Sequence, residues 1–256
     1  MAKVCDVLAF LDTIAPTDLK MDWDNVGLLC GRREAQIHKI LVALDPFEDV
    51  CREAAQVGAD LIVTHHPLIF SPLKAVIADD AVGRSILFLA ARGISAVNAH
   101  TNLDRAPGGV NDRLAQALGL ENVQTLDPAG AALIRTGKVY PQPLDTFLAT
   151  VKDKLGCEGL RFADGSRPVH QVAVGGGACA SALAEVAAAG CDTFVTADVK
   201  YNQFQDARDL HLNLIDAGHF PTEAPIVAVL AQKLAEAFPS VAVQASQTNR
   251  DCIHFF

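Results

Sequence analysis

A twelve-residue segment of the sequence recurs 132 positions later without a gap. Residues 53–64 (EAAQVGADLIVT) align with residues 185–196 (EVAAAGCDTFVT), and six of the twelve positions are identical. In both copies an alanine-rich stretch leads to a glycine and then to a short apolar run, a pattern typical of a helix, a turn and a buried strand. Alanine-rich helices that end in glycine are common, so a chance match stays open. A true repeat implies two similar halves, which we place at residues 1–125 and 126–256.

Short apolar runs alternate with helical patterns along both halves. The sequence predicts buried strands at residues 40–44, 61–63, 94–97, 172–174, 193–195 and 212–215. This alternation favours an α/β fold with a largely parallel sheet in each half. Ligands bind beyond the carboxyl ends of the strands in such sheets. We therefore expect the functional site at those strand ends, in the cleft between the two halves.

The composition excludes several classes of protein. Half of the residues are hydrophobic, which argues against a disordered chain. The net charge of −9 and the aromatic content of 6% argue against broad nucleic-acid binding. No apolar stretch reaches the ~20 residues of a membrane span, and charged residues interrupt the N-terminus where a signal peptide would be apolar. The seven cysteines show no C-x-x-C spacing, so we expect free thiols and a cytoplasmic protein.

Two adjacent histidines, His65 and His66, follow the strand at 61–63 and precede Pro67. At a strand end, with proline shaping the next turn, both imidazoles can reach one polar pocket from different sides. That arrangement suits two neighbouring metal ions better than one. The alternative is a pair of solvent-facing histidines.

Three further candidates follow other strands. Asp104 comes after the strand at 94–97, and a carboxylate beside two imidazoles is a usual ligand set for zinc, manganese or iron. In the second half, His219 is expected in a strand-to-helix loop and Glu223 near the start of the helix that contains Pro225. The alternatives are a turn-forming Asp104, a loop histidine at 219, and a Glu223 that only stabilises a helix start.

Together these residues supply three histidines and two carboxylates. An open catalytic zinc site uses three protein ligands, so five fit two metal ions with a bridging carboxylate such as Glu223. His100 and Asp198 also lie after strands and are candidates to orient a ligand without touching the metal. We expect two divalent cations per chain, drawn from Zn, Mn, Fe and Co.

Five blocks of sequence carry a family resemblance: 23–29 (WDNVGLL), 64–70 (THHPLIF), 99–104 (AHTNLD), 108–112 (GGVND) and 216–223 (DAGHFPTE). On these blocks the chain resembles the Nif-three-like dinuclear metal-centre proteins, often labelled GTP cyclohydrolase I type 2 homologues. The resemblance implies the ligand set His65, His66, Asp104, His219 and Glu223. It also implies a homohexameric toroid whose sites face an internal cavity. The sequence departs from the family at Asp251-Cys252, where relatives usually have proline after the acid.

The expected function is that of a metal-dependent hydrolase with a small-molecule substrate. The family label implies a purine nucleotide such as GTP, with attack at the imidazole-ring carbon and release of formate; a phosphoester is a second substrate class. The alternative is a non-enzymatic metal-binding hexamer that stores, delivers or senses metal, or serves as an interaction platform. A ring that encloses DNA is disfavoured by the net charge of −9.

Overall fold

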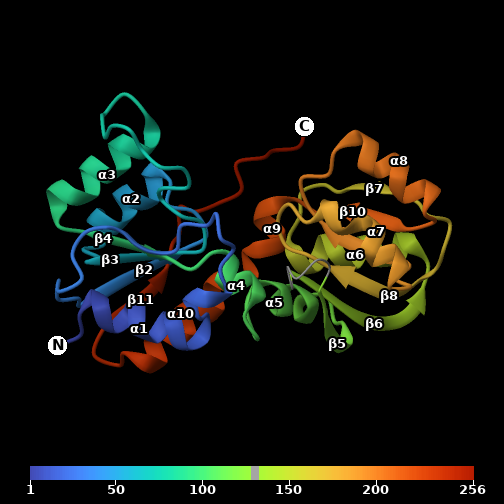
Figure 1. Cartoon of the computed structure of the whole chain (residues 1–256), viewed down its shortest axis with the longest axis horizontal. Helices are drawn as coiled ribbons and strands as arrows, with labels where there is room; N and C mark the ends of the chain where they lie inside the picture. Colours follow the sequence, from blue (N-terminus) through green and yellow to red (C-terminus); the bar gives the residue numbers. More distant parts are fainter. Residues whose placement is uncertain (128–132) are drawn as a thin grey trace. The chain divides into compact units, whose positions relative to one another are not determined.

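The computed structural model describes residues 1–127 and 133–256, and it divides the chain into two compact units (Figure 1). The first unit comprises Met1–Pro107 and Ile226–Arg250, and the second comprises Gly108–Pro225 and Asp251–Phe256. Each unit is an α/β structure with its own sheet. The predicted α/β class with two similar halves is therefore confirmed.

The first unit contains a five-stranded sheet in the order β1-β4-β3-β2-β11. Its strands are β1 (Gly27–Cys30), β2 (Lys39–Ala43), β3 (Leu61–Thr64), β4 (Ser95–Asn98) and β11 (Ala242–Ala245). All neighbours pair in parallel except β1, which runs antiparallel to β4 and is not among the predicted strands. The helices are α1 (Val4–Ile14), α2 (Glu48–Gln56), α3 (Ala81–Arg92), α4 (Thr101–Arg105) and α10 (Pro225–Ala237), with a 3-10 turn at Thr17–Leu19.

Helices cover both faces of this sheet, with α2 and α3 on one side and α1 and α10 on the other (Figure 1). Strands buried on both faces are apolar on both, which explains why residues 40–43 of β2 and 61–63 of β3 are continuous apolar runs rather than alternating ones. Leu41 and Ile62 pack with Val50 of α2 and Leu89 of α3 in one buried cluster. This core fixes where the strands end, and so where the residues that follow them lie.

The second unit contains a six-stranded sheet in the order β5-β6-β8-β9-β10-β7. Its strands are β5 (Glu121–Leu126), β6 (Ile134–Gln142), β7 (Arg161–Ala163), β8 (Val169–Val174), β9 (Thr193–Thr196) and β10 (Asn213–Asp216). The central strands β8, β9 and β10 are parallel, while β5, β6 and β7 add antiparallel pairs. The helices are α5 (Val110–Ala117), α6 (Leu144–Leu155), α7 (Leu183–Ala188), α8 (Tyr201–Asp209) and α9 (His219–Glu223), with a 3-10 turn at Ala180–Ala182.

The sequence repeat corresponds to equivalent structure in the two units. The carboxylate of Asp60 accepts hydrogen bonds from the backbone N–H groups of His38 and Lys39 at the start of β2. Asp192, 132 positions later, accepts the same bonds from His170 and Gln171 in β8. The short helices α4 and α9 are also equivalent, since each spans five residues and follows the strand after the repeated segment. The duplicated segment thus places the end of a strand and a short helix in both units.

The compact units do not end at the predicted boundary of residue 125. Leu114 of α5 packs with Phe147 of α6 in the core of the second unit, although α5 precedes the predicted boundary. Conversely, the ring of Phe238, just after α10, lies edge-on to Phe10 of α1, with centroids 5.7 Å apart, and β11 pairs with β2. Each half therefore contributes its last helix to the other unit, which local sequence patterns do not reveal.

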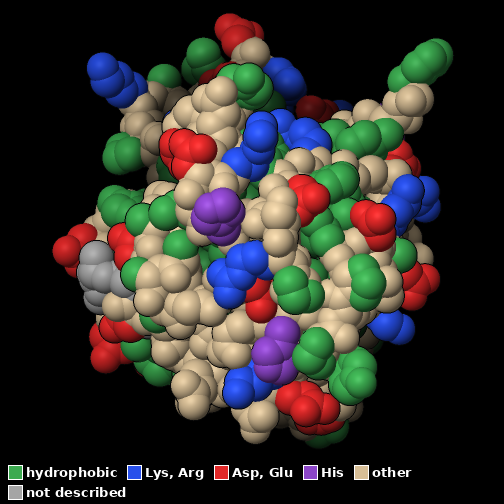
Figure 2. Space-filling view, turned by 90° about the vertical axis from the view of Figure 1, so that its right-hand side faces the viewer, with side chains coloured by type: hydrophobic (Ala, Val, Ile, Leu, Met, Phe, Trp, Pro, Cys, Tyr) green, Lys and Arg blue, Asp and Glu red, His purple; other side chains and the backbone are tan. Residues whose placement is uncertain are grey.

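Among the helices of residues 1–127 and 133–256, none combines the length and hydrophobicity that crossing a bilayer requires. On the face drawn in Figure 2, basic side chains are interspersed with acidic and hydrophobic ones.

Candidate metal centre

His65 and His66 lie directly after β3, and both rings are held by hydrogen bonds through the same nitrogen. His65 Nδ1 lies 3.0 Å from the backbone oxygen of Ala99, and His66 Nδ1 lies 2.7 Å from Oδ1 of Asp45. The ring centroids are 4.8 Å apart. His65 is fully buried, so the pair is not the solvent-facing one of the alternative interpretation.

These hydrogen bonds select the tautomer of each ring. The backbone oxygen of Ala99 can only accept, so Nδ1 of His65 carries the hydrogen. A neutral imidazole with hydrogen on Nδ1 presents the lone pair of Nε2, which is the form that binds a metal. A carboxylate such as Asp45 at the other nitrogen also makes the ligand more basic. Both histidines are thus prepared to donate through Nε2.

Asp104 lies on the short helix α4 and is buried within the first unit. Its Oδ1 is 3.5 Å from Nε2 of His65. Two ligands that bind one tetrahedral zinc ion at ~2.0–2.2 Å are separated by roughly 3.3 Å. The spacing of these two donor atoms is therefore close to that of two ligands on one cation.

His100 is the residue immediately before α4, and it completes a cluster of three imidazoles. One nitrogen from each of His65, His66 and His100 lies within 4.8 Å of the other two. His100 Nδ1 is 2.8 Å from Oδ1 of Asp24, whose Oδ2 accepts hydrogen bonds from the backbone and hydroxyl of Thr101. Burial alone would raise the pKa of Asp24, but the bonds from His100 and Thr101 outweigh burial and lower that pKa to about 2. Asp24 is thus a carboxylate that fixes the orientation of His100.

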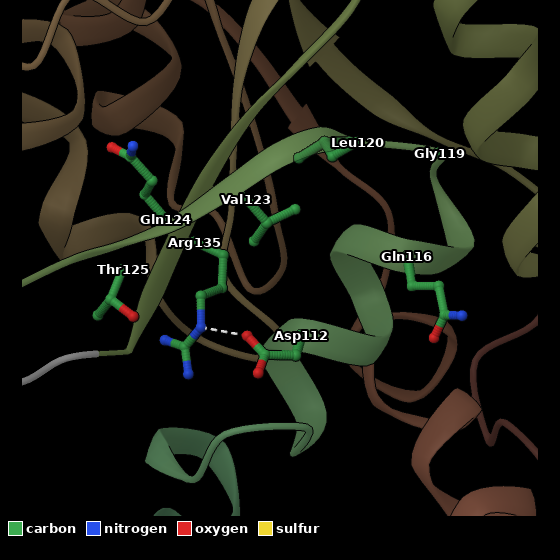
Figure 3. Close-up of a pocket in the computed structure, with 8 residues that line it drawn as sticks. All are labelled: Asp112, Gln116, Gly119, Leu120, Val123, Gln124, Thr125 and Arg135. Carbon is green, nitrogen blue, oxygen red and sulfur yellow. Dashed lines mark hydrogen bonds and ion pairs between the residues drawn. The ribbon is translucent and has the colours of Figure 1, made fainter.

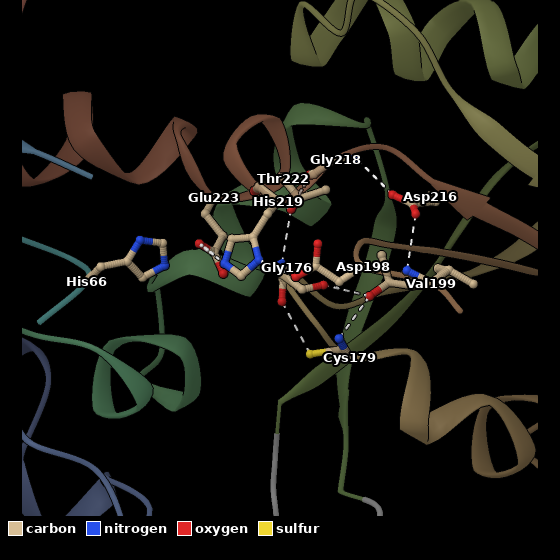
Figure 4. Close-up of polar contacts among 12 residues, drawn as sticks. His66, Gly176, Cys179, Asp198, Val199, Asp216, Gly218, His219, Thr222 and Glu223 are labelled. Carbon is tan, nitrogen blue, oxygen red and sulfur yellow. Dashed lines mark hydrogen bonds and ion pairs between the residues drawn. The ribbon is translucent and has the colours of Figure 1, made fainter. Parts of the chain in front are cut away.

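In the second unit, the two candidates lie one turn apart on α9 (Figure 4). His219 Nε2 is 3.1 Å from Oε2 of Glu223, and His219 Nδ1 is 2.7 Å from Oδ2 of Asp198. The predicted positions need correction, because both residues belong to α9 and not to a loop and the start of the next helix. The i, i+4 spacing on one helix is what brings the imidazole and the carboxylate together.

Asp216 fixes the loop that carries Asp198. This carboxylate ends β10 and accepts hydrogen bonds from the backbone N–H groups of Val199 and Gly218, both at 3.1 Å, and it pairs with Arg161 (Figure 4). One side chain therefore connects the residue after Asp198 to the residue before His219. Asp198 itself has a left-handed backbone, with φ of +53°, so its conformation depends on these contacts.

The glycine turn after β8 leaves room for both donors of α9. A Cβ on Gly177 would lie 2.3 Å from Oε1 of Glu223 and 3.0 Å from Nε2 of His219. The N–H groups of this turn bond to protein atoms: Gly176 donates to Asn111, and Gly177 donates to Thr222. The turn therefore forms the wall of the donor pair, and its amides are committed to the protein instead of a phosphate.

Sequence reasoning missed the carboxylate partners Asp24 and Asp45. Asp45 follows β2 directly, and β2 neighbours β3, which precedes His66. Carboxyl ends of adjacent parallel strands meet at one edge, so this proximity was predictable. Asp24 precedes the antiparallel strand β1, and no periodic pattern placed it beside His100.

A separate cavity of about 460 Å³ lies in the second unit between α5 and the strands β5 and β6 (Figure 3). Its lining includes Gln116 and Gln124 and a buried Arg135 that pairs with Asp112. None of the candidate metal ligands belongs to its lining as described. The ion pair neutralises the guanidinium, so this cavity has no excess of positive charge from Arg135.

The donor types in both units suit a divalent metal ion. Imidazole nitrogens and carboxylate oxygens are common ligands of zinc, iron and manganese. In each unit an imidazole Nε2 lies next to a carboxylate oxygen, and in each of His65, His66, His100 and His219 the other ring nitrogen is held by an acceptor. The fold and these groups define a two-unit α/β protein with histidine-carboxylate sets that could hold metal.

Comparison with known proteins places the chain in one family. The model of the family described as Duf34/NIF3 (NGG1p interacting factor 3) matches residues 2–252, and the chain belongs to this family. A Clostridium perfringens protein named GTP cyclohydrolase 1 type 2 homolog is 34% identical over 93% of both chains. A Helicobacter pylori protein named GTP cyclohydrolase 1 type 2 is 31% identical over 91% of this chain and 92% of its own. The crystal structure of a Bacillus cereus protein related to NIF3 superposes with a TM-score of 0.92 at 26% identity, covering 100% of this chain and 99% of that one.

Proposed function

We propose that the chain is a metal-dependent hydrolase that binds two divalent cations. The ligands in this proposal are His65, His66 and Asp104 from the first unit and His219 and Glu223 from the second. The observation that carries the proposal is the shared state of His65, His66 and His219, each of which has Nδ1 held by an acceptor, as is usual for histidines that bind a metal through Nε2.

The number of available ligands supports the proposal of two cations. His219 and Glu223 supply only two donors, whereas a catalytic zinc site uses three protein ligands. The second-unit pair therefore needs further ligands, and the first unit holds more donors than one open site requires. We propose that Glu223 bridges the two ions, because one carboxylate can offer an oxygen to each.

Two bound cations would lower the pKa of a shared water and so supply a hydroxide nucleophile. The protein's own contribution is orientation. Asp45 and Asp198 hold the rings of His66 and His219 in the donating tautomer, and the buried positions of His65 and Glu223 exclude bulk water from their donor atoms. The names of the relatives from C. perfringens and H. pylori support GTP or a related nucleotide as substrate, with other phosphoesters as the second class.

The proposed assembly is a cytoplasmic homohexamer, as the family resemblance implies. Light scattering on the purified protein tests it, and the mass of a single chain at micromolar concentration would contradict it. A non-enzymatic role in metal storage or sensing is the second candidate. It is favoured by the burial of His65 and Glu223, since closed, buried ligand sets are typical of structural metal sites.

One experiment separates the two roles. Metal-loaded protein is incubated with GTP, other nucleotides and phosphoesters, and the products are identified by mass spectrometry. Turnover that disappears on chelation and returns on reloading supports the hydrolase. Full metal occupancy without turnover of any substrate supports the storage role.

A further inference from the structure

Two exposed aromatic side chains flank the histidine cluster of the first unit. Trp23 is 58% exposed and Phe70 is 59% exposed, so both rings are open to solvent. Their centroids are 5.8 Å apart with the planes tilted by 55°. Each ring also lies edge-on to His100, at 6.2 Å and 6.3 Å. The two aromatic rings therefore contact the imidazole of His100 and belong to the same cluster of rings.

Partly buried hydrogen bonds hold the backbone that carries both rings. The side chain of Asn25 donates to the backbone oxygen of Ile69, the residue before Phe70, at 2.7 Å. The side chain of Asn98, at the end of β4, donates to the backbone oxygen of Asn25 at 3.1 Å. Asp24, next to Trp23, orients His100. The segments around residues 23–25 and 69–70 are thus tied to each other and to the sheet.

The geometry of the pair fits a ring from outside the protein. Two tilted rings that do not stack on each other leave a face of each available, and their fixed backbone lowers the entropic cost of binding. Nδ1 of His66 faces the carboxylate of Asp45 and Nδ1 of His100 faces that of Asp24, so negative charge next to both rings disfavours a bare anion. A flat unsaturated ring, by contrast, gains stacking energy from an indole or phenyl face.

We propose that Trp23 and Phe70 are positioning residues that bind a planar heterocyclic ring, such as a nucleobase, beside the histidine cluster. This inference rests on the proposed function for what happens to the bound molecule. Its binding step does not need metal, because the aromatic faces are present without it. The pair would then select substrates by the ring they carry, while the metal ligands act on a polar group of the same molecule.

The test uses Trp23 as its own reporter, since it is the only tryptophan in the sequence. Metal-free protein is titrated with GMP and UMP, with ribose 5-phosphate as the ringless control, and tryptophan fluorescence is recorded. We expect saturable quenching by at least one nucleotide and none by ribose 5-phosphate. Absence of saturable quenching by both nucleotides would overturn the proposal.

Variants of Phe70 separate stacking from other effects. Phe70→Leu keeps an apolar side chain without the aromatic plane, and we expect it and Phe70→Ala to weaken nucleotide binding about tenfold. Tyr140→Ala removes a ring that is 88% exposed in the second unit and should leave binding unchanged. Both Phe70 variants should retain the metal content of the wild type.

The outcomes distinguish this proposal from the proposed function. A protein that binds nucleotide but no metal would refute the hydrolase and would still support the ring-binding site. Unchanged nucleotide binding together with a changed oligomeric mass would overturn the ring site and make the pair a contact between copies.

Discussion

Nδ1 of His66 lies 2.7 Å from Oδ1 of Asp45. Asp45 follows the neighbouring strand β2, and its carboxylate sets the tautomer of the histidine ring. The other oxygen of Asp45 accepts a hydrogen bond from the side chain of Asn249 at 3.2 Å. The same side chain of Asn249 accepts from the backbone N–H of Leu44 at 2.6 Å. Asp45 is therefore held on both sides before any ligand binds.

Asp45→Asn should weaken metal binding about 10–100-fold, the usual effect of removing a carboxylate partner from a metal-binding histidine. The substitution preserves shape but removes the charge that makes the imidazole of His66 a better donor. Isothermal titration with zinc and cobalt measures the affinity. Asp79→Asn, at an exposed position, is the control that should bind as the wild type does. Equal affinities for Asp45→Asn and the wild type would mean that His66 is not a ligand.

Gly177→Ala should lower metal affinity more than an alanine at another glycine with the same left-handed backbone does. A Cβ at this position would come within 2.3 Å of Oε1 of Glu223 and 3.0 Å of Nε2 of His219. The matched control is Gly156→Ala, because Gly156 has a similar φ of +67°, against +60° for Gly177, and nothing within 4 Å of the added carbon. Both variants carry the backbone strain, so a difference in metal binding isolates the crowding of the donors. Equal metal binding by the two variants would remove Glu223 and His219 from the site.

Glu53 predicts a pH-dependent contribution to stability. It is a buried carboxylate that accepts hydrogen bonds from the hydroxyl of Ser246 and from the backbone N–H groups of Gln247 and Thr248. Burial alone would raise the pKa of Glu53, but these hydrogen bonds outweigh it and lower that pKa below its ordinary value of 4.5. The folded state thus favours the ionised form, so this stabilisation is present above the unfolded pKa and is lost as the pH falls through the lower, folded pKa.

Glu53→Gln should therefore reduce the free energy of unfolding by about 1 kcal/mol at neutral pH and by progressively less under acid conditions. Urea unfolding followed by circular dichroism at several pH values measures the difference. Glu185→Gln is the control, because Glu185 occupies the equivalent position of the repeat but is exposed. A destabilisation that does not change with pH would show that the charge of Glu53 contributes nothing.

Much of the fold followed from local sequence patterns. The runs at 40–44 and 61–63 are apolar throughout because parallel central strands are buried on both faces, and the repeat placed the strand ends correctly. The exchange of α5 and α10 between the units could not be predicted, because it depends on which core the apolar faces of those helices enter. The patterns also failed at β1 and at α9, which are only four and five residues long, too short for periodicity to distinguish from a loop.

The candidate ligands could be predicted from the sequence, whereas most of the carboxylates that hydrogen-bond to the histidines could not. His65, His66, Asp104, His219 and Glu223 all follow strands, and strand ends are where α/β sheets bind ligands. The contacts of Asp24 and Asp45 depend on which strands are neighbours. The contact of Asp198 depends on its left-handed backbone conformation, which the sequence around it does not indicate. These relationships arise from tertiary structure and leave no periodic signal.

Metal stoichiometry in three proteins tests the central claim most directly. Wild type, Glu223→Gln and His219→Ala are reconstituted with zinc, manganese, iron or cobalt, and the ions per chain are measured by elemental analysis, with circular dichroism to verify folding. We expect up to two ions per wild-type chain and the loss of mainly one ion in His219→Ala. The loss should be greater in Glu223→Gln, because a bridging carboxylate binds both cations. Trace metal in the reconstituted wild type, or two tightly held ions in Glu223→Gln, would contradict the central claim.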